Sequence, residues 1–215
     1  MKKKFFALMM AMVMVLSLAA CGGSDEADSN SGDSAGGESS GSSAFKVGVI
    51  GPLTGGAAIY GNAAYRGAQI AVDEINALGG VQFELNFQDD ENDVEKAMNA
   101  YNNLKDWGMQ LSLGSVTSKP CEATAAENYS DRIFALTPSA SSVAVTEGKD
   151  NVFQMCFMDP NQGSASAQYI AENGLATKVA GIYRNDDAYS TGIYNTFAQE
   201  APELGLEIVY EGTFT

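Results

Sequence analysis

The sequence contains no histidine among its 215 residues. Histidine is the usual general base at neutral pH and the commonest metal ligand in proteins. Its absence argues against most hydrolytic and metal-dependent enzymes, and the sequence offers no other evident pair of nucleophile and base. We therefore expect a protein that is not an enzyme, with no catalytic residue, no metal and no cofactor.

Basic residues are also scarce, because 12 Lys and Arg stand against 27 Asp and Glu, a formal net charge of −15. A surface this acidic repels nucleic acid and anionic lipid headgroups, so neither is expected as a ligand. Small solutes and other proteins remain as partners.

Two motifs that would indicate nucleotide or metal binding are incomplete. The glycines within 51–56 are not followed by Gly-Lys-Ser/Thr, and no Gly-x-Gly-x-x-Gly turn opens the first helix. The acidic cluster of Asp89, Asp90, Glu91 and Asp93 lacks the ligand spacing of a calcium loop. A solvated turn followed by a helix cap at Asp93 accounts for this cluster.

The N-terminal apolar run is too short to span a membrane. Residues 5–18 carry no charge and follow three lysines, whereas a spanning helix needs about 20 apolar residues. This pattern predicts an export signal over residues 1–20. The segment Leu18-Ala19-Ala20-Cys21 resembles the lipobox of bacterial lipoproteins, which implies a lipid on Cys21 and an extracytoplasmic protein anchored to the cell membrane. The alternative is an ordinary signal peptide whose cysteine is incidental.

The segment after Cys21 has the composition of a flexible tether. Residues 24–44 are almost entirely Ser, Gly, Asp, Glu, Asn and Ala, with no aromatic or branched aliphatic residue. Such a segment buries too little apolar surface to offset the entropy of ordering, so we expect residues 21–44 to be a disordered tether. Removal of the signal leaves nine basic and 27 acidic residues, a net charge of −18.

From Phe45 onward, buried-strand and amphipathic-helix patterns alternate with short turns. This alternation predicts parallel sheets covered on both faces by helices, an α/β fold. Expected strands lie at 45–50, 81–87, 109–113, 133–136, 152–157, 179–183 and 206–210. Expected helices lie at 62–78, 94–107, 122–130, 162–173 and 191–201.

A long polar stretch between 136 and 162 interrupts the alternation and predicts a crossing from one sheet to a second, with Asp159-Pro160 as the boundary. We expect lobe 1 over residues 45–158 and the start of lobe 2 over residues 159–215. Two strands are few for a sheet of this class, whose mean is about five or six strands. Lobe 2 is therefore expected to be incomplete, in a chain that is a fragment of a longer protein.

Cysteine usage beyond Cys21 leaves two alternatives. Cys121 and Cys156 are expected either as two buried free thiols or as a disulfide, because spacing alone does not place them within bridging distance.

Several motifs over Phe45 to Thr215, taken in order, resemble the leucine/isoleucine/valine-binding proteins, the amino-acid receptors of bacterial ABC importers. They are the segments 46–55, 60–61, 67–68, 73–76, 79–80, 89–90, 114–118, 137–141 and 187–189. The resemblance implies a type 1 periplasmic-binding fold of two Rossmann-like lobes. It also implies capture of an amino acid, most often branched-chain, between hinged lobes, and an ABC permease as partner.

The resemblance also implies roles for individual residues. Thr117 and Ser118 occupy the position that binds the ligand carboxylate. The positions of Ser139, Ala140 and Ser141 match a loop that holds the ammonium and carboxylate groups. Purely structural alternatives are that Ser118 is only an N-cap residue and that the serines at 139 and 141 belong to a flexible turn.

Two tyrosines, Tyr60 and Tyr189, match residues that line the pocket from different lobes, although loop tyrosines are common. One departure weakens Tyr189, because the family has Tyr-Gly where this chain has Tyr189-Ser190. The family's acid for the ligand ammonium lies beyond Thr215.

Other departures from the family concern the substrate. The type member of the family has a disulfide where this chain has Asn92-Asp93 and Thr117. Lys119 beside Ser118 is also unusual. Either its positive charge favours a ligand with an extra carboxylate, or it is a solvated surface lysine without a role in binding. Rival functions are binding of another solute (an amide, urea or an aromatic acid), a sensory ectodomain and, more distantly, an extracellular enzyme.

Overall fold

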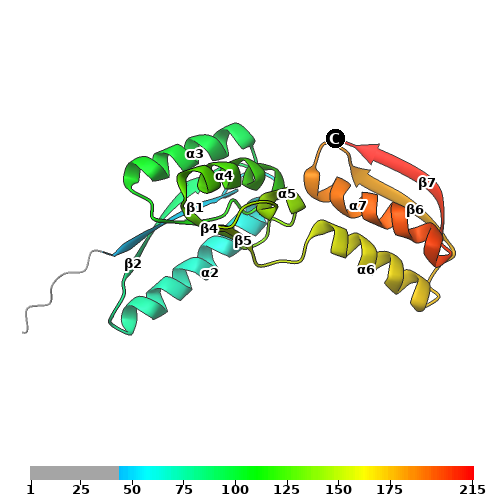
Figure 1. Cartoon of the computed structure of the whole chain (residues 1–215), viewed down its shortest axis with the longest axis horizontal. Coiled ribbons are helices and arrows are strands. Elements are labelled where there is room, and N and C mark those ends of the chain that lie inside the picture. Colours follow the sequence, from blue (N-terminus) through cyan, green and yellow to red (C-terminus); the bar gives the residue numbers. More distant parts are fainter. Residues whose placement is uncertain (1–43) are drawn as a thin grey trace, which may run out of the picture. The chain divides into compact units, whose positions relative to one another are not determined.

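The computed structural model describes residues 44–215, which belong to one compact unit, Gly41–Thr215 (Figure 1). The predicted signal over 1–20, Cys21 and the tether up to residue 43 lie outside the described residues and stay predictions. Within residues 44–215, no helix is both long and apolar enough to cross a membrane.

The first sheet is five-stranded and parallel throughout, in the order β2-β1-β3-β4-β5. Its strands are β1 (Phe45–Gly51), β2 (Phe83–Asp89), β3 (Leu111–Leu113), β4 (Phe134–Thr137) and β5 (Val152–Gln154). The connecting helices are α2 (Ala58–Ala77), α3 (Val94–Trp107), α4 (Ser118–Asp131) and the short α5 (Val143–Thr146).

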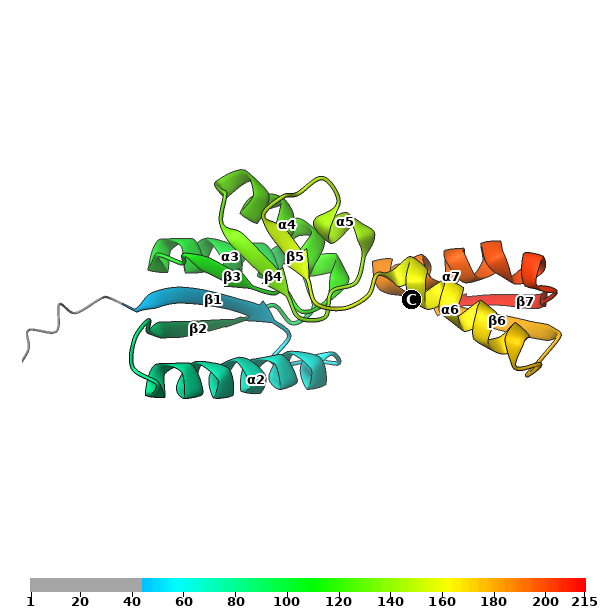
Figure 2. The same cartoon turned by 60° about the horizontal axis from the view of Figure 1, so that its bottom comes forward.

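Helices cover both faces of this sheet, as the sequence predicts. Figure 2 shows α2 on one face and α3 and α4 on the other. The main core cluster joins β1 to α3 through Ile50, Tyr101 and Leu104, each of which is fully buried. Apolar burial of this kind is the dominant favourable contribution to folding.

Helix α3 begins and ends where the sequence predicts. The side chain of Asp93 accepts a hydrogen bond from the Lys96 N–H at 2.9 Å, which caps the first turn. Gly108 ends the helix in the left-handed conformation that glycine adopts without strain.

Close backbone approaches shape the carboxyl-terminal edge of the sheet. A Cβ on Gly61 would lie 1.9 Å from the Pro52 carbonyl oxygen, and a Cβ on Gly114 would lie 2.1 Å from that of Ile50. Only glycine fits at these two positions, the first in the first turn of α2 and the second directly after β3. The loops at this edge are therefore held tightly against one another.

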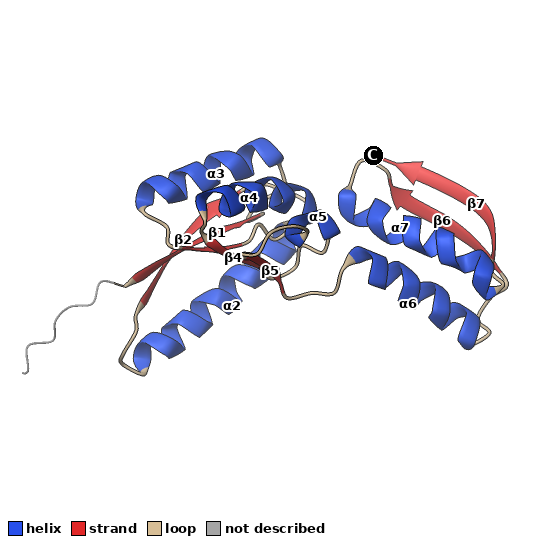
Figure 3. Cartoon of the chain, viewed as in Figure 1, coloured by secondary structure: helices blue, strands red, loops and turns tan. Residues whose placement is uncertain are grey.

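The second sheet contains two parallel strands, β6 (Lys178–Arg184) and β7 (Glu207–Phe214). The accompanying helices are α6 (Asp159–Glu172), α7 (Ala188–Glu200) and the 3₁₀ helix η1 (Ala201–Leu204). In Figure 3 the helices α6 and α7 are blue and the two strands are red. A small core of Ala167, Ala201 and Leu206, flanked by Phe197, joins these elements.

The main errors of sequence-based prediction lie at helix starts. Helix α2 begins four residues, α4 four residues and α6 three residues before the predicted positions 62, 122 and 162. Their first turns contain proline, glycine, serine or aspartate, so the periodic pattern of apolar residues that predicts a helix is missing there. The helices nevertheless form, because proline is tolerated in a first turn. Helix α5 was not predicted, β5 ends at Gln154 rather than 157, and β7 extends to Phe214 rather than 210.

Both described cysteines are free thiols, so the disulfide alternative is wrong. Cys121 is buried in a cluster with Ala125, Ala140 and Val152, whereas Cys156 is only half-buried. The prediction of two buried thiols therefore holds for Cys121 alone.

Candidate ligand-binding site

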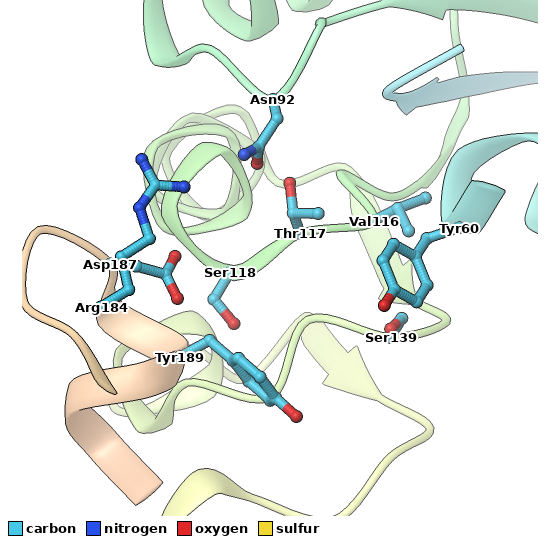
Figure 4. A pocket seen from close by; sticks show the side chains of 9 residues that line it. All are labelled: Tyr60, Asn92, Val116, Thr117, Ser118, Ser139, Arg184, Asp187 and Tyr189. Atoms are coloured by element: carbon cyan, nitrogen blue, oxygen red, sulfur yellow. The ribbon is translucent and has the colours of Figure 1, made fainter. Parts of the chain in front are cut away.

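A cavity of about 300 Å³ opens where the strands end (Figure 4). Every lining residue lies at or after the carboxyl end of a parallel strand, the usual position of ligands in open α/β sheets. The lining residues are Tyr60 after β1, Asn92 after β2, Val116, Thr117 and Ser118 after β3, Ser139 after β4, and Arg184, Asp187 and Tyr189 at and after β6.

Ser118 is buried at the first residue of α4 and does not cap that helix. Its hydroxyl oxygen accepts hydrogen bonds from the backbone N–H groups of Ser141 at 3.1 Å and Ser142 at 3.3 Å. A serine hydroxyl has two acceptor lone pairs and one proton to donate. With both lone pairs engaged, the Ser118 proton remains free for an acceptor in the cavity.

Thr117 occupies the N-cap position of α4, but its side chain makes no capping hydrogen bond. Its Oγ1 atom is buried and has no hydrogen-bond partner among residues 44–215. The N-terminal end of α4 adds a positive dipole end directed at the same region. Hydroxyl groups and the helix N-terminus together suit a carboxylate.

The serine loop, residues 137–142, is fixed by internal hydrogen bonds. The Thr137 hydroxyl donates to the Ser115 carbonyl at 2.8 Å and accepts from the Ala140 N–H at 3.0 Å. Ser139 lines the cavity with its side chain largely exposed. Ala140 does not line it, because its side chain packs in the cluster around Cys121.

Ser141 does not line the cavity either, because its hydroxyl donates to Asp159 Oδ1 at 2.5 Å. The Asp159 N–H in turn donates to the Ser141 carbonyl at 2.9 Å. Asp159 is 1% exposed, and its Oδ2 has no partner among the described residues. Burial raises the pKa of the Asp159 carboxyl group, against the hydrogen bond from Ser141 that lowers it.

Two aromatic side chains form one wall of the cavity. Tyr60 comes from α2 and is 61% exposed, while Tyr189 comes from α7 and is 43% exposed. The Tyr189 hydroxyl donates to Gln162 Oε1 at 3.3 Å, which holds the ring beside α6. Ser190, the departure from the family pattern, donates its N–H to Asp187 as part of the α7 cap.

A charged loop borders the cavity at the end of β6. Arg184 pairs with Asp186 through Nε to Oδ1 at 2.7 Å and Nη2 to Oδ2 at 3.2 Å. Lys119 is exposed on α4, and its Nζ donates to the Asp186 carbonyl at 3.4 Å. Asp187 caps α7 by accepting from the Ser190 N–H at 3.0 Å.

The cavity thus unites five of the seven predicted site residues, and not the side chains of Ala140 and Ser141. Sequence analysis did not name Asn92, Val116, Arg184 or Asp187 as lining residues. A usable signal existed, because each lies within three residues of the end of a strand or of an already named site residue.

The chemistry of the cavity is that of a binding site for a small polar molecule. Its hydroxyl, amide and backbone groups offer donors and acceptors, and neutral groups satisfy both ends of a zwitterion without a permanent buried charge. Within residues 44–215, no cluster of His, Cys, Asp or Glu side chains is arranged to hold a metal ion.

Known proteins share this architecture. The Leu/Ile/Val-binding protein BraC3 of Rhizobium johnstonii is 35% identical over 176 residues, covering 79% of this chain and 47% of its own length. The crystal structure of the leucine binding protein LivK from Thermotoga maritima matches with a TM-score of 0.74 at 30% identity, covering 79% of this chain and 49% of that chain. The branched-chain amino acid transporter substrate binding protein LivJ of Streptococcus pneumoniae, in complex with isoleucine, matches with a TM-score of 0.75 at 32% identity, covering 80% and 50%.

The chain spans about half the length of the curated relatives it matches. The sequence pattern of the periplasmic binding protein family matches residues 44–215, which include every described element. The predicted α/β fold and the resemblance to the leucine/isoleucine/valine-binding proteins are confirmed. The chain belongs to the periplasmic binding protein family.

Proposed function

We propose that this protein is an extracytoplasmic receptor that binds an amino acid between two lobes, residues 45–158 and the lobe that begins at residue 159. The ligand's α-carboxylate accepts hydrogen bonds from the Ser118 hydroxyl and from backbone N–H groups at the N-terminal end of α4. Its α-ammonium group donates to oxygen atoms of the serine loop at Ser139 and Ala140. Tyr60 and Tyr189 cover the bound molecule.

One observation carries this proposal. The Ser118 hydroxyl uses both acceptor positions on backbone N–H groups of the serine loop. Its proton therefore has a fixed direction, and a carboxylate is the acceptor that gains most from a preorganised donor. The backbone carbonyls of the same loop supply the complementary acceptors for an ammonium group.

The wider role is that of a receptor for a membrane importer. We propose that closure of the lobes over the ligand excludes water, strengthens each polar contact, and creates the surface that an ABC permease recognises. A lipid on Cys21 and the tether up to residue 44 hold the receptor near that permease. Since BraC3 and LivJ are named for branched-chain amino acids, such a ligand is the first expectation from relatives.

A thermal-shift screen of the complete gene product against the common amino acids tests the binding role. A ligand at 100 times its dissociation constant adds about 2.7 kcal/mol to the free energy of unfolding, so a binder raises the unfolding midpoint. A rise with one or a few amino acids supports the proposal. No rise with any amino acid, together with a rise for an unrelated solute, would overturn it.

The lipid anchor has its own test. Membrane fractions of bacteria that express the complete gene product are expected to contain it, with a diacylated N-terminal peptide by mass spectrometry. The Cys21→Ser variant is expected in the soluble extracytoplasmic fraction. Equal membrane association of both forms would contradict anchoring through Cys21.

A further inference from the structure

Three further polar side chains line the cavity. Asn92, Thr117 and Arg184 come from the ends of β2, β3 and β6 and converge on one side of the cavity. In Figure 4 the Asn92 amide and the Thr117 hydroxyl point toward one another, and the Arg184 side chain extends toward the same side of the cavity. These three residues form what we call the amide wall.

Each residue of the amide wall retains unused hydrogen-bonding capacity within residues 44–215. Thr117 Oγ1 is buried without a partner, although its N-cap position offers it the backbone of α4. The side-chain amide of Asn92 makes no hydrogen bond to any described residue, because only its backbone N–H is engaged, by Asp90. Arg184 uses Nε and Nη2 on Asp186, which leaves Nη1.

The charges around this wall balance. The bidentate pair with Asp186 neutralises Arg184. One further cation, Lys119, donates to the Asp186 carbonyl, and one further acid, Asp187, lines the cavity. The wall therefore offers donors and acceptors without excess charge of either sign. A neutral group that both donates and accepts hydrogen bonds is its best complement.

An aliphatic side chain is a poor complement of the amide wall, whose three side chains are all polar. A leucine-like side chain would remove water from the exposed Asn92 and Arg184 side chains and would give neither them nor the buried Thr117 Oγ1 a hydrogen bond in return. A site built to hydrogen-bond a polar group discriminates strongly against an isostere that lacks it, because the buried polar groups of the site are then left unpaired.

We infer that the amide wall selects an amino acid whose side chain ends in a carboxamide. This inference rests on the proposed function, which places the α-carboxylate and α-ammonium groups at Ser118 and the serine loop. The carboxamide oxygen accepts from the Thr117 hydroxyl or Arg184 Nη1, and its NH₂ group donates to the Asn92 side-chain oxygen. The charge balance disfavours a side-chain carboxylate at the same place.

Asparagine, aspartate and leucine have the same number and branching of heavy atoms, so they form a matched set of probes. Isothermal titration of the complete gene product with each is expected to give a dissociation constant for asparagine that is at least tenfold lower than that for leucine. If the longer carboxamide fits better, the same difference is expected between glutamine and glutamate. Tighter binding of leucine, isoleucine or valine would overturn the inference and leave the proposed function standing. Tighter binding of aspartate or glutamate would overturn the neutral character of the group.

Two near-isosteric variants locate the selection in the wall. Thr117→Val and Asn92→Leu are expected to lower the preference for asparagine over leucine at least tenfold, while Asn102→Leu on the exposed face of α3 leaves it unchanged. An unchanged preference in both wall variants, with unfolding midpoints near wild type, would overturn the inference. The ligand series on the unaltered protein can refute the inference by itself, so the test remains valid even if a variant misfolds. Absence of binding by every amino acid would overturn the proposed function, and this inference with it.

Discussion

The hydroxyl oxygen of Ser118 accepts a hydrogen bond from the backbone N–H of Ser141 at 3.1 Å. This contact joins the start of α4 to the serine loop, two segments that follow neighbouring strands of the sheet. It orients the Ser118 proton and fixes the loop carbonyls at the same time. One side chain thus positions the two segments that the proposed function assigns to the carboxylate and ammonium groups of the ligand.

Replacement of Ser118 by alanine is expected to weaken amino-acid binding about 10- to 100-fold, since a hydrogen bond to a charged group is worth about 1.5–3 kcal/mol. The same change leaves the N–H groups of Ser141 and Ser142 without their acceptor, so the free energy of unfolding should fall by about 1–3 kcal/mol. Titration calorimetry and urea unfolding measure the two effects. Ser166→Ala, at an exposed serine of α6, serves as the control and should change neither quantity appreciably. Unaltered affinity in Ser118→Ala would remove this residue from the site.

Asp159 predicts a distinct pH dependence of stability. Burial raises the pKa of its carboxyl group in the folded protein above the unfolded value. Between these two values the folded state binds more protons than the unfolded state, so the contribution of Asp159 to stability decreases as the pH rises through this window. Above it, the cost of the buried charge is fully present.

The Asp159→Asn variant removes this cost and keeps an oxygen that accepts from the Ser141 hydroxyl. At neutral pH its free energy of unfolding is expected to exceed that of the wild type, by on the order of 1 kcal/mol. The difference should shrink as the pH falls toward 4, as urea unfolding at a series of pH values can measure. Asp150→Asn provides a contrast, because the hydrogen bond from Arg132 lowers the pKa of Asp150 and the stability that it adds is lost on acidification. A difference for Asp159→Asn that is constant with pH would contradict this account.

The two thiols should differ in reactivity. Burial raises the pKa of Cys121 to about 12, and that of Cys156 is raised less while its side chain stays partly accessible. The thiolate is the reactive form, so Cys121 should be labelled by an aromatic disulfide reagent only after unfolding. Peptide mass spectrometry of the native protein should therefore find the label on Cys156 but not on Cys121, and should find it on both after unfolding. Labelling of Cys121 in the native protein at the rate seen for Cys156 would show that the cluster around Cys121 opens readily.

Sequence analysis predicted the sheet more reliably than it predicted the site. Strands such as β1 and helices such as α3 are specified by apolar patterns and caps that act over a few residues. Local sequence is therefore sufficient to predict these elements. The starts of α4 and α6 were missed because Pro120 and Pro160 weaken the helical pattern in a first turn that tertiary contacts stabilise.

The site depends on which loops meet, which local patterns do not encode. Tyr60, Thr117, Ser118, Ser139 and Tyr189 were named because of the family resemblance, and they line one cavity. Asp159 was read as a boundary residue, yet its buried carboxyl group bonds Ser141. Arg184 and Asn92 lie at or just after the ends of β6 and β2, a position that the sequence indicates, but which strand ends meet at one cavity is decided by the packing of the two sheets.

Lys119 predicts an electrostatic contribution to ligand affinity. Its Nζ lies on α4 and donates to the Asp186 carbonyl in the loop after β6, so it links segments on both sides of the cavity. Lys119→Met keeps the length of the side chain and removes the charge; it is expected to weaken ligand binding about two- to fivefold, as for an exposed ionic contact of 0.2–1 kcal/mol.

The effect of Lys119→Met should decline above about 0.5 M salt, where exposed charges are screened. Lys149→Met, at an exposed lysine bonded to the Ala144 carbonyl, is the matched control. Equal affinities of wild type and Lys119→Met at low salt would identify Lys119 as a solvated surface residue.

We propose that the cavity recognises the α-ammonium and α-carboxylate groups of an amino acid together. Calorimetric titration of the complete gene product with the best-binding amino acid, and with its analogues that lack either the amino or the carboxyl group, tests this recognition. Each analogue is expected to bind at least 100-fold more weakly than the parent, because Ser118 or the serine loop then loses its charged partner. Equal affinity for the parent and either analogue would show that the cavity does not recognise both groups.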